Sequence, residues 1–431
     1  ARYSNNPEPY PGGAPIDVNG IAFHSYYYLK RLVTFLNAVD LRLSQSRKSA
    51  EIAVGYYPQY NYPRSYMLWA NEPISSFKKV FQEEIDQNKS LFYIIKTFSN
   101  HNVDFTVVNL SCVILEDLQQ YRILFIQSYK YMDRATLIKI LDYVNSGGIL
   151  VMGPEFPSLD IDMSLLKDLP IVIKCTEIIR EKEIKRPTSI EWSDGELKIA
   201  GHLNYFADSK DSKVLARDGE LPCILQLAYG KGQIILVGFD YYLSSEDNYK
   251  FFNNIFEKFS IIPCYCWISE NDSKVNIFRR TSKNSTFLFV TNRSEDTKVV
   301  EIDYLDEFET TRKLYISVRG KGNSIIETKR GHIVSAAVQG SDSCVIRTKS
   351  LSIMAEGINE FIFAKTDRGE HIIVGDRCGK VTVQSSILQS NISVTRRDGK
   401  SVGRYISDTE FEFEYLPRED LNPYVFVGWS E

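Results

Sequence analysis

The chain has 431 residues, of which 43% are hydrophobic and 25% are charged, so it can bury sizeable cores and is not intrinsically disordered. At roughly 100–200 residues per domain, this length predicts two to four domains. The formal net charge of −4 argues against nonspecific nucleic-acid binding, which needs a basic surface. No segment approaches the ~20 apolar residues of a membrane span, and no signal-peptide pattern opens the sequence. We therefore expect a cytoplasmic protein that binds neither nucleic acid nor membrane.

The first 45 residues combine a breaker-rich loop with one helix. Residues 1–20 contain many prolines and glycines, which predicts an extended loop. Apolar residues then recur at helical spacing and predict a helix over residues 26–39. The apolar face expected for this helix consists of Leu29, Leu32, Val33 and Leu36, flanked by Tyr28, Phe35 and Val39.

Strand and helix patterns alternate from about residue 46 to residue 262. The predicted strands cover residues 51–57, 103–108, 122–127, 149–152 and 233–238. Four helices are predicted in this region. The first starts near Ser75 or Ser76, and the second covers residues 116–120. The third follows the capping residue Asp133 and ends at Gly147-Gly148, and the fourth covers residues 248–259. This alternation is typical of a doubly wound, flavodoxin-like or amidotransferase-like parallel sheet with helices on both faces. We expect the charge-rich stretch 155–228 to be less regular.

Short strand patterns separated by turn residues fill the chain after Pro263. They cover residues 275–278, 287–291, 299–302, 313–316, 333–337, 344–347, 360–364, 372–375, 380–383 and 424–428. Such a pattern is typical of one or two β-sandwich domains. The predicted fold class is therefore α/β plus all-β. We place the boundaries at 1–45, 46–262 and 263–431, with an alternative internal boundary near residue 340.

Aromatic residues make up 13% of the chain and are concentrated before residue 70. Aromatic rings stack on sugars, and they also form interfaces between domains because each ring buries a large area. Tyr60 and Trp69 are the candidates for sugar stacking in this cluster.

Sequence patterns for catalysis and metal binding are weak. The nucleophile motif Gly-x-Ser-x-Gly and the phosphate loop are both missing from the sequence. A Cys112–His202 pair, or Ser128 after a predicted strand, is the remaining option for a nucleophile. Asp160-Ile161-Asp162 has metal-binding spacing, but a capping loop explains it better. We expect no cofactor, no metal ion, and reduced thiols in the seven cysteines.

Several motifs resemble segments of β-galactosidase-like glycoside hydrolases. Residues 12–20 and the following Leu29-Lys30-Arg31-Leu32 are similar to the exit from the catalytic barrel in family 35. Residues 122–127, 143–148 and 230–241 resemble the amidotransferase-like domain of family 42, and residues 287–293 resemble the opening of the β-sandwich in those enzymes.

This resemblance implies an accessory role. The catalytic (β/α)₈ barrel of the family takes ~250 residues, and its two catalytic glutamates have no counterpart here. We therefore expect no catalytic residue in this chain, and a catalytic barrel chain or domain as its partner. The resemblance also implies a galactoside substrate and an oligomer built through the α/β domain. Tyr10 and Asp17 would lie near the active end of the barrel. A fragment, a split-enzyme subunit and a degenerate homologue all fit this pattern.

Two other functions remain open from the sequence. One is a carbohydrate-binding protein without hydrolysis, which would use the aromatic cluster or the faces of the β-domains. The other is an independent amidotransferase-like hydrolase that uses Cys112 or Ser128.

Overall fold

The structure of the protein is a computed structural model. It describes residues 16, 22, 24–48, 50–61, 91–166, 168–169, 177–192, 195–207, 210–241, 243–268, 274–366, 371–385, 393–395, 401–407, 409–416 and 424–427. The chain divides into two compact units. The α/β unit is Ala50–Cys264, and the β-rich unit combines Ala1–Ser49 with Tyr265–Glu431. The first helix therefore groups with the β-rich unit, whereas the sequence pattern predicts a separate segment at residues 1–45.

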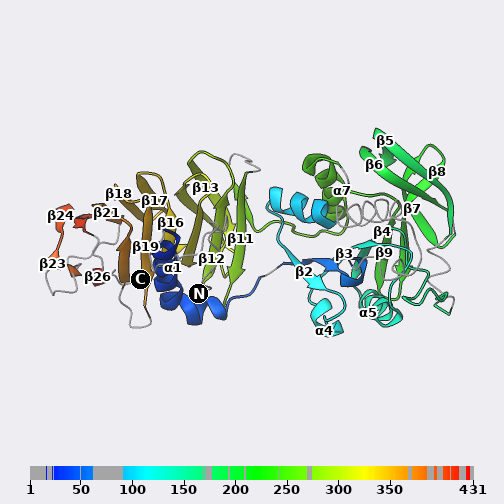
Figure 1. Ribbon diagram of the computed structural model, residues 1–431, viewed down its shortest axis with the longest axis horizontal. Coiled ribbons are helices and arrows are strands. Elements are labelled where there is room, and N and C mark those ends of the chain that lie inside the picture. Colours follow the sequence, from blue (N-terminus) through cyan, green and yellow to red (C-terminus); the bar gives the residue numbers. More distant parts are fainter. Residues whose placement is uncertain are drawn as a thin grey trace. The chain divides into compact units, whose positions relative to one another are not determined.

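The α/β unit contains one nine-stranded sheet and several helices (Figure 1). Its elements are β1 (Ile52–Tyr56), the 3-10 helix η1 (Pro58–Asn61), a helical stretch at 91–100, β2 (Phe105–Asn109), α4 (Leu115–Leu118), β3 (Ile123–Ser128), α5 (Arg134–Asn145), β4 (Ile149–Pro154), β5 (Ile178–Trp192), β6 (Gly195–Phe206), β7 (Ser212–Asp218), β8 (Leu221–Tyr229), β9 (Gly232–Val237) and α7 (Ser245–Lys258).

The sheet of the α/β unit has a parallel part and an antiparallel part. Its strand order is β2-β1-β3-β4-β9-β8-β7-β5-β6. The pairs from β2 to β9 are parallel, which confirms the predicted parallel sheet, and the pairs from β9 to β6 are antiparallel.

The antiparallel part corrects the expectation that residues 155–228 are less regular than the rest of the unit. The four strands β5 to β8 fill most of this stretch. The longest of them, β5, is charge-rich and largely exposed, so it lacks the apolar alternation that marks a half-buried strand.

Helices contribute to the cores on both faces of the parallel strands. Along β1, Ile52 and Val54 belong to one hydrophobic cluster and Ala53 to another, because successive side chains point to opposite faces. The first cluster includes Phe98 of the helical stretch 91–100 and Phe252 of α7. The second includes the buried apolar residues of α4 and α5.

The turn before β9 packs on the end of α5. Gly232 fits there because a Cβ atom would lie 2.2 Å from the carbonyl oxygens of both Val144 and Gly148. Gly230 has a φ of +57°, which glycine adopts without strain. Close packing and backbone conformation therefore both require glycine in the Gly230-Lys231-Gly232 turn.

The β-rich unit contains one helix and two antiparallel sheets (Figure 1). Its elements are α1 (His24–Ser44), β10 (Cys266–Ile268), β11 (Val275–Thr281), β12 (Thr286–Asn292), β13 (Lys298–Leu305), β14 (Thr311–Val318), β15 (Asn323–Lys329), β16 (His332–Gln339), β17 (Ser343–Arg347), β18 (Leu351–Glu356), β19 (Glu360–Lys365), β20 (His371–Gly375), β21 (Gly379–Ser385), β22 (Ser393–Thr395), β23 (Ser401–Val402), β24 (Arg404–Ser407), β25 (Glu410–Tyr415) and β26 (Tyr424–Val427).

The two sheets of this unit enclose a single hydrophobic core, as expected for a sandwich. One sheet has the order β10-β13-β14-β17-β18-β21-β25-β24, and the other has the order β11-β12-β15-β16-β19-β20-β26-β22-β23. Buried residues from Cys266 to Tyr415 form one cluster between them. This core includes residues on both sides of residue 340, the position of the predicted alternative boundary.

Helix α1 packs on the outer face of the second sheet, against β16 and β19 (Figure 1). Phe35, Ala38 and Val39 are buried there, whereas Leu29 and Val33 remain exposed. The predicted helix is confirmed, and the sheet covers the side that carries the flanking residues Phe35 and Val39 rather than the side that carries Leu29 and Val33. Apolar residues lie on both faces of the helix, so their spacing alone does not select the face that the sheet covers. In the part of the chain that the structure describes, no helix combines the length and apolar composition of a membrane span.

Candidate functional site

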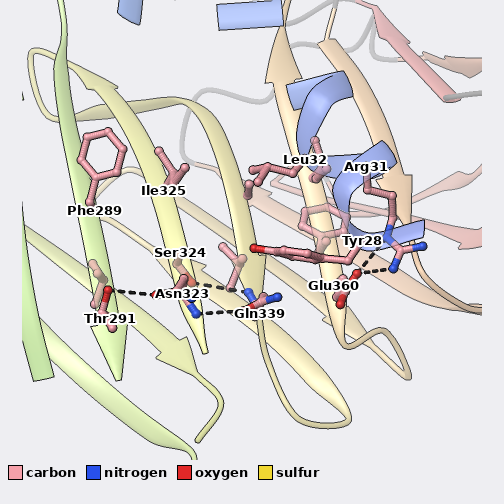
Figure 2. A pocket seen from close by; sticks show the side chains of 15 residues that line it. Tyr28, Arg31, Leu32, Phe289, Thr291, Asn323, Ser324, Ile325, Gln339 and Glu360 are labelled. Atoms are coloured by element: carbon pink, nitrogen blue, oxygen red, sulfur yellow. Dashed lines mark hydrogen bonds and ion pairs between the residues drawn. The ribbon is translucent and has the colours of Figure 1, made fainter. Parts of the chain in front are cut away.

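A pocket of about 280 Å³ lies between the first half of α1 and the outer face of the sandwich (Figure 2). Helix α1 and the strands β12, β15, β16 and β19 all contribute to it. The lining residues are Tyr28, Arg31, Leu32, Phe289, Val290, Thr291, Asn323, Ser324, Ile325, Ala337, Val338, Gln339, Glu360, Phe361 and Ile362.

The floor of the pocket is an apolar row that crosses four strands. Phe289 pairs with Ile325, Ile325 with Ala337, and Ala337 with Ile362. Residues in register on adjacent strands point to the same face of a sheet. The row therefore presents one aromatic ring and three aliphatic side chains toward the helix.

A polar row runs beside the floor, two residues further along each strand. Thr291 pairs with Asn323, and Gln339 pairs with Glu360. The Thr291 hydroxyl donates to Asn323 Oδ1 at 2.9 Å, and the Asn323 backbone N–H donates to Gln339 Oε1 at 2.8 Å. Because side chains alternate with a period of two, this row faces the same side as the floor. The pocket thus has an apolar base and one polar edge.

A buried ion pair closes one end of the pocket (Figure 2). Arg31 Nε donates to Glu360 Oε2 at 2.8 Å, and Arg31 Nη2 donates to the same oxygen. Glu360 is only 4% exposed. Its other oxygen, Oε1, is buried and has no hydrogen-bond partner within the described residues. An unsatisfied buried acceptor is costly and uncommon, so it marks a position where a ligand donor would be stabilised.

Tyr28 and Gln339 add two further polar groups. Figure 2 shows the ring of Tyr28 extending from α1 across the strands toward Ser324 and Ile325. Burial and the nearby Glu360 carboxylate raise the pKa of Tyr28, so its hydroxyl stays protonated at neutral pH. The amide oxygen of Gln339 is engaged by Asn323, and its NH₂ group makes no hydrogen bond to a described residue.

This arrangement suits binding rather than bond cleavage. Glycoside hydrolysis usually needs two carboxyl groups about 5–10 Å apart. Glu360 is the one acidic side chain among the lining residues, and Arg31 already pairs with it. An apolar base beside a hydrogen-bonding edge is instead typical of a small-molecule pocket.

The four substrate-binding residues predicted from the sequence do not meet in this pocket. Tyr10, Asp17 and Trp69 lie outside the described residues. Tyr60 is 7% exposed and belongs to the core of the α/β unit. Its ring makes edge contacts with those of Tyr57, Tyr129 and Tyr131. Its sugar-stacking role is corrected to a packing role, because a stacking ring needs an accessible face.

The Cys112–His202 pair is not formed. Cys112 follows β2, whereas His202 Nε2 lies 2.9 Å from Asn204 Oδ1, and the Asn204 amide donates to the carbonyl of Pro154 at the end of β4. Strands β1 and β3 separate β2 from β4, which at about 4.8 Å per strand puts the two groups roughly 14 Å apart. That separation excludes the proton transfer that a cysteine nucleophile needs.

Ser128 is also unsuited to nucleophilic attack. It is fully buried within β3, and its hydroxyl donates to the carbonyl of Glu155. The hydroxyl therefore forms a structural hydrogen bond that links the ends of β3 and β4.

The Asp160–Asp162 segment accepts hydrogen bonds from backbone N–H groups, but it contacts the start of α5, which precedes it, instead of capping the next helix as the sequence predicts. Asp160 Oδ1 accepts from the backbone N–H groups of Ile161 and, at 3.3 Å, of Arg134 in the first turn of α5. Asp162 accepts from the N–H of Ser164. No group of three or more potential metal ligands occurs among the residues with described positions.

Sequence reasoning missed the residues that line the pocket. Arg31 and Glu360 are 329 positions apart, so no local pattern connects them. A usable signal is that Glu360 opens a predicted strand and leaves a charge on a face that is otherwise apolar. Buried charges are rare unless they are paired.

Comparisons with known proteins point to glycoside-active enzymes. The family described as "GLMA-like, second domain" matches residues 74–212. Over 250 residues the chain is 26% identical to an exo-beta-D-glucosaminidase of Pyrococcus horikoshii, a match that covers 56% of this chain and 30% of that enzyme. Over 314 residues it is 20% identical to a beta-1,2-glucosyltransferase of Ignavibacterium album, covering 71% of this chain and 43% of that protein.

The fold has solved counterparts as well. A GH42 beta-galactosidase from G. stearothermophilus is similar over 74% of this chain and 46% of its own, with a TM-score of 0.55 and 16% identity. The chain thus spans about a third to a half of the length of these relatives. The family, sequence and fold matches together show that the chain resembles the non-barrel part of a glycoside hydrolase.

Proposed function

We propose that this chain is the non-catalytic accessory and assembly part of a β-galactosidase-like glycoside hydrolase, and that it acts with a catalytic (β/α)₈ barrel from the same or another polypeptide. One observation carries the proposal. The fold match takes in 74% of this chain but under half of the β-galactosidase, and the sequence matches cover similarly partial shares of the glucosaminidase and glucosyltransferase. The substrate of the assembled enzyme would be a galactoside or a related glycoside.

The α/β unit fits the assembly role. We interpret its parallel strands, with helices contributing to the cores on both faces, as a doubly wound, amidotransferase-like domain that no longer carries that chemistry. The separation of Cys112 from His202 and the burial of Ser128 support this interpretation. A cytoplasmic location remains a prediction from the sequence.

The outer face of α1 is the proposed docking surface for the barrel. Tyr27, Leu29, Val33 and Leu41 lie there with 43%, 43%, 49% and 59% of their surfaces exposed. Exposed apolar residues on one helix face favour contact with another protein surface. The resemblance of this segment to a barrel-exit helix supports the barrel as the proposed occupant.

The edge strand β2 is the proposed oligomer contact. In the described part of the chain, β2 ends the nine-stranded sheet and pairs with β1 alone. An unpaired strand edge presents backbone donors and acceptors to a second copy. Val107 on this strand is exposed and would contribute apolar area.

Docking is tested by mixing the purified chain with a separately produced barrel from a homologous glycoside hydrolase. Complex formation is measured by light scattering after gel filtration, and hydrolysis of chromogenic galactosides and glucosaminides is followed in parallel. We expect a complex that Leu29→Asp with Val33→Asp abolishes and that Val299→Asp leaves intact. Val299 is a matched control because it is exposed on β13, away from α1.

Hydrolysis by the purified chain alone would contradict the accessory role. Equal complex formation by the α1 variant and the Val299→Asp control would contradict the docking surface. Val107→Lys tests the oligomer separately, since we expect it to lower the molar mass of the assembly without preventing binding to the barrel.

A further inference from the structure

We propose that the pocket between α1 and the sandwich is a carbohydrate-binding site that holds one pyranose ring. The site lies wholly within the β-rich unit, on residues of α1, β12, β15, β16 and β19. It goes beyond the accessory role, because it requires neither the barrel nor any catalytic group.

The arrangement of apolar and polar groups in the pocket fits a sugar ring. A pyranose has an apolar C–H face and a rim of hydroxyl groups. The row from Phe289 to Ile362 supplies an apolar base with one aromatic ring. The row from Thr291 to Glu360 supplies the hydrogen-bonding edge at right angles to the strands. A purely apolar ligand would leave that edge unsatisfied, and a linear polar ligand would leave the base uncovered.

Two polar groups of the lining residues make no hydrogen bond within the described part of the chain and are available to the ring. Glu360 Oε1 accepts from no described residue, although it is fully enclosed. The NH₂ group of Gln339, a residue that is 94% buried, donates to no described residue. An acceptor and a donor on adjacent strands match neighbouring hydroxyl groups, each of which can both donate and accept.

The charge of the pocket favours a neutral ring over an anion. Arg31 is the one cationic side chain among the lining residues, and both of its bonding nitrogens face Glu360. The Arg31–Glu360 pair has no net charge, and the Tyr28 hydroxyl stays protonated. A phosphate or carboxylate would therefore meet no unpaired positive charge to offset its desolvation.

The size of the site limits the ligand. Pockets for drug-sized molecules are about 300–1,000 Å³, so a pocket of about 280 Å³ suits one ring. We infer that it takes a monosaccharide or a terminal residue of a glycan, with the glycosidic end directed to solvent.

The test uses the purified chain without any barrel. Methyl β-D-galactopyranoside, N-acetyl-D-glucosamine and D-glucose, which are all uncharged, are titrated by calorimetry, and binding is checked by saturation-transfer NMR. We expect saturable binding of at least one of these sugars and none of glycerol 3-phosphate. Ala337→Met fills the base of the pocket and should abolish binding. Ala228→Met is the matched control, because Ala228 is an exposed strand residue of the α/β unit.

A second variant guards against a folding defect in Ala337→Met. Tyr28→Phe removes one hydroxyl from the wall of the pocket and should weaken binding about fivefold, the value of one hydrogen bond. The proposal is overturned if the folded wild-type chain binds none of the three sugars, or if Ala337→Met binds as tightly as Ala228→Met. Neither result bears on docking of the barrel, so the two proposals fail separately.

Discussion

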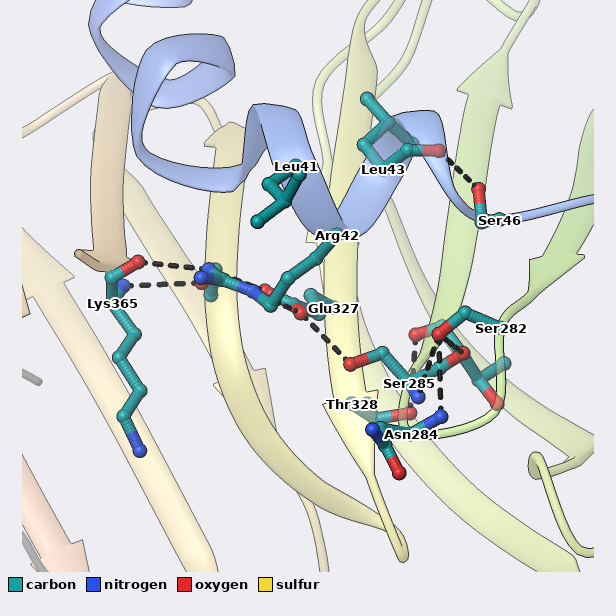
Figure 3. A network of polar contacts seen from close by, with 12 residues as sticks. Leu41, Arg42, Leu43, Ser46, Ser282, Asn284, Ser285, Glu327, Thr328 and Lys365 are labelled. Atoms are coloured by element: carbon teal, nitrogen blue, oxygen red, sulfur yellow. Dashed lines mark hydrogen bonds and ion pairs between the residues drawn. The ribbon is translucent and has the colours of Figure 1, made fainter. Parts of the chain in front are cut away.

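Arg42 of α1 and Glu327 of β15 form a two-point ion pair that anchors the helix to the sandwich (Figure 3). Arg42 Nε and Nη2 donate to the two oxygens of Glu327 at 2.7 and 3.1 Å. Ser285 donates to Glu327 as well, at 3.0 Å, and the carbonyl of Lys365 accepts from Arg42 at 2.8 Å. With the Arg31–Glu360 pair, Arg42 fixes which face of α1 meets the sheet. The pocket depends on that choice, since Tyr28, Arg31 and Leu32 form its helical wall.

Replacing Arg42 with methionine should destabilise the β-rich unit. Glu327 is fully buried, and the variant leaves its charge without a counterion. Removing one partner of a buried pair costs about 3–5 kcal/mol, and we expect about 3 kcal/mol because Ser285 still donates to Glu327. Urea unfolding measures this loss, and hydrogen exchange should accelerate in peptides from His24–Ser44.

Lys321→Met is the control for Arg42→Met. Lys321 and Glu295 form an ion pair whose side chains are 67% and 79% exposed. Exposed pairs contribute about 0–1 kcal/mol, so this variant should unfold near the wild-type midpoint. If Arg42→Met and Lys321→Met unfold alike, the anchoring role of Arg42 is wrong.

Asp133 should stabilise α5 as its N-cap. Its side chain accepts from the backbone N–H of Thr136 at 2.8 Å and from the Tyr57 hydroxyl at 2.8 Å. Loss of such a cap costs about 0.5–2 kcal/mol. Asp133→Ala should therefore lower the unfolding free energy of the α/β unit by about 1 kcal/mol. Asp133→Asn should recover part of that loss because its amide oxygen can still accept.

The contribution of Asp133 should also depend on pH. Partial burial alone would raise the pKa of Asp133, but the hydrogen bonds from Thr136 and Tyr57 outweigh it and hold the pKa below its ordinary value. A lowered folded-state pKa gives stability that is present above the unfolded pKa of about 3.9 and is lost as the pH falls through the folded value. Chemical denaturation at pH 7 and at pH 3 should show a smaller difference between wild type and Asp133→Asn in acid. An unchanged difference would mean that the carboxylate charge adds nothing.

Tyr60→Ala should unfold the α/β unit more easily rather than remove a sugar site. The Tyr60 ring packs among three other tyrosine rings, and its hydroxyl accepts from the N–H of Tyr129 at 3.3 Å. Truncating a buried aromatic side chain costs about 3–5 kcal/mol. Tyr60→Phe keeps the ring and should cost about 1 kcal/mol. Urea unfolding of both variants checks this order, and equal midpoints for Tyr60→Ala and wild type would restore the stacking interpretation.

Much of the fold was predictable because local patterns reflect burial. The strand at 122–127 is buried on both faces and so has an uninterrupted apolar run. The helix after Asp133 shows its cap and its buried Leu137, Leu141 and Val144 at helical spacing. Strand β5 was not predicted because its side chains are mostly exposed and show no apolar alternation. Hairpin pairing with β6, rather than an apolar face, stabilises this strand.

The pocket was not predictable for a different reason. Its helical wall and its polar edge come from segments that are far apart in the sequence. Apolar residues at helical spacing lie on more than one face of α1. The ion pairs Arg42–Glu327 and Arg31–Glu360 determine which face contacts the sheet. Only the folded sandwich brings each arginine to its glutamate, so helical periodicity alone could not tell the exposed Leu29 and Val33 from the buried Phe35 and Val39.

The cysteines should differ in reactivity according to their burial. Burial raises the pKa of the Cys223, Cys264 and Cys344 thiols to about 12. At pH 8, about one part in 10⁴ of such a thiol is the reactive thiolate. Cys112 and Cys378 are exposed. Iodoacetamide at pH 8 should therefore modify these two first, as measured by peptide mass spectrometry.

Raising the pH is the internal control for that labelling experiment. In the folded protein, the three buried thiols should stay unreactive between pH 7 and pH 9, because this range is well below their pKa of about 12. They should react only when the protein unfolds in denaturant. Cys344 lies in the sandwich core and Cys223 in the α/β core, so each reports on its own unit. Labelling of Cys344 in the native protein as fast as Cys378 would show that the sandwich core opens, and would contradict its close packing.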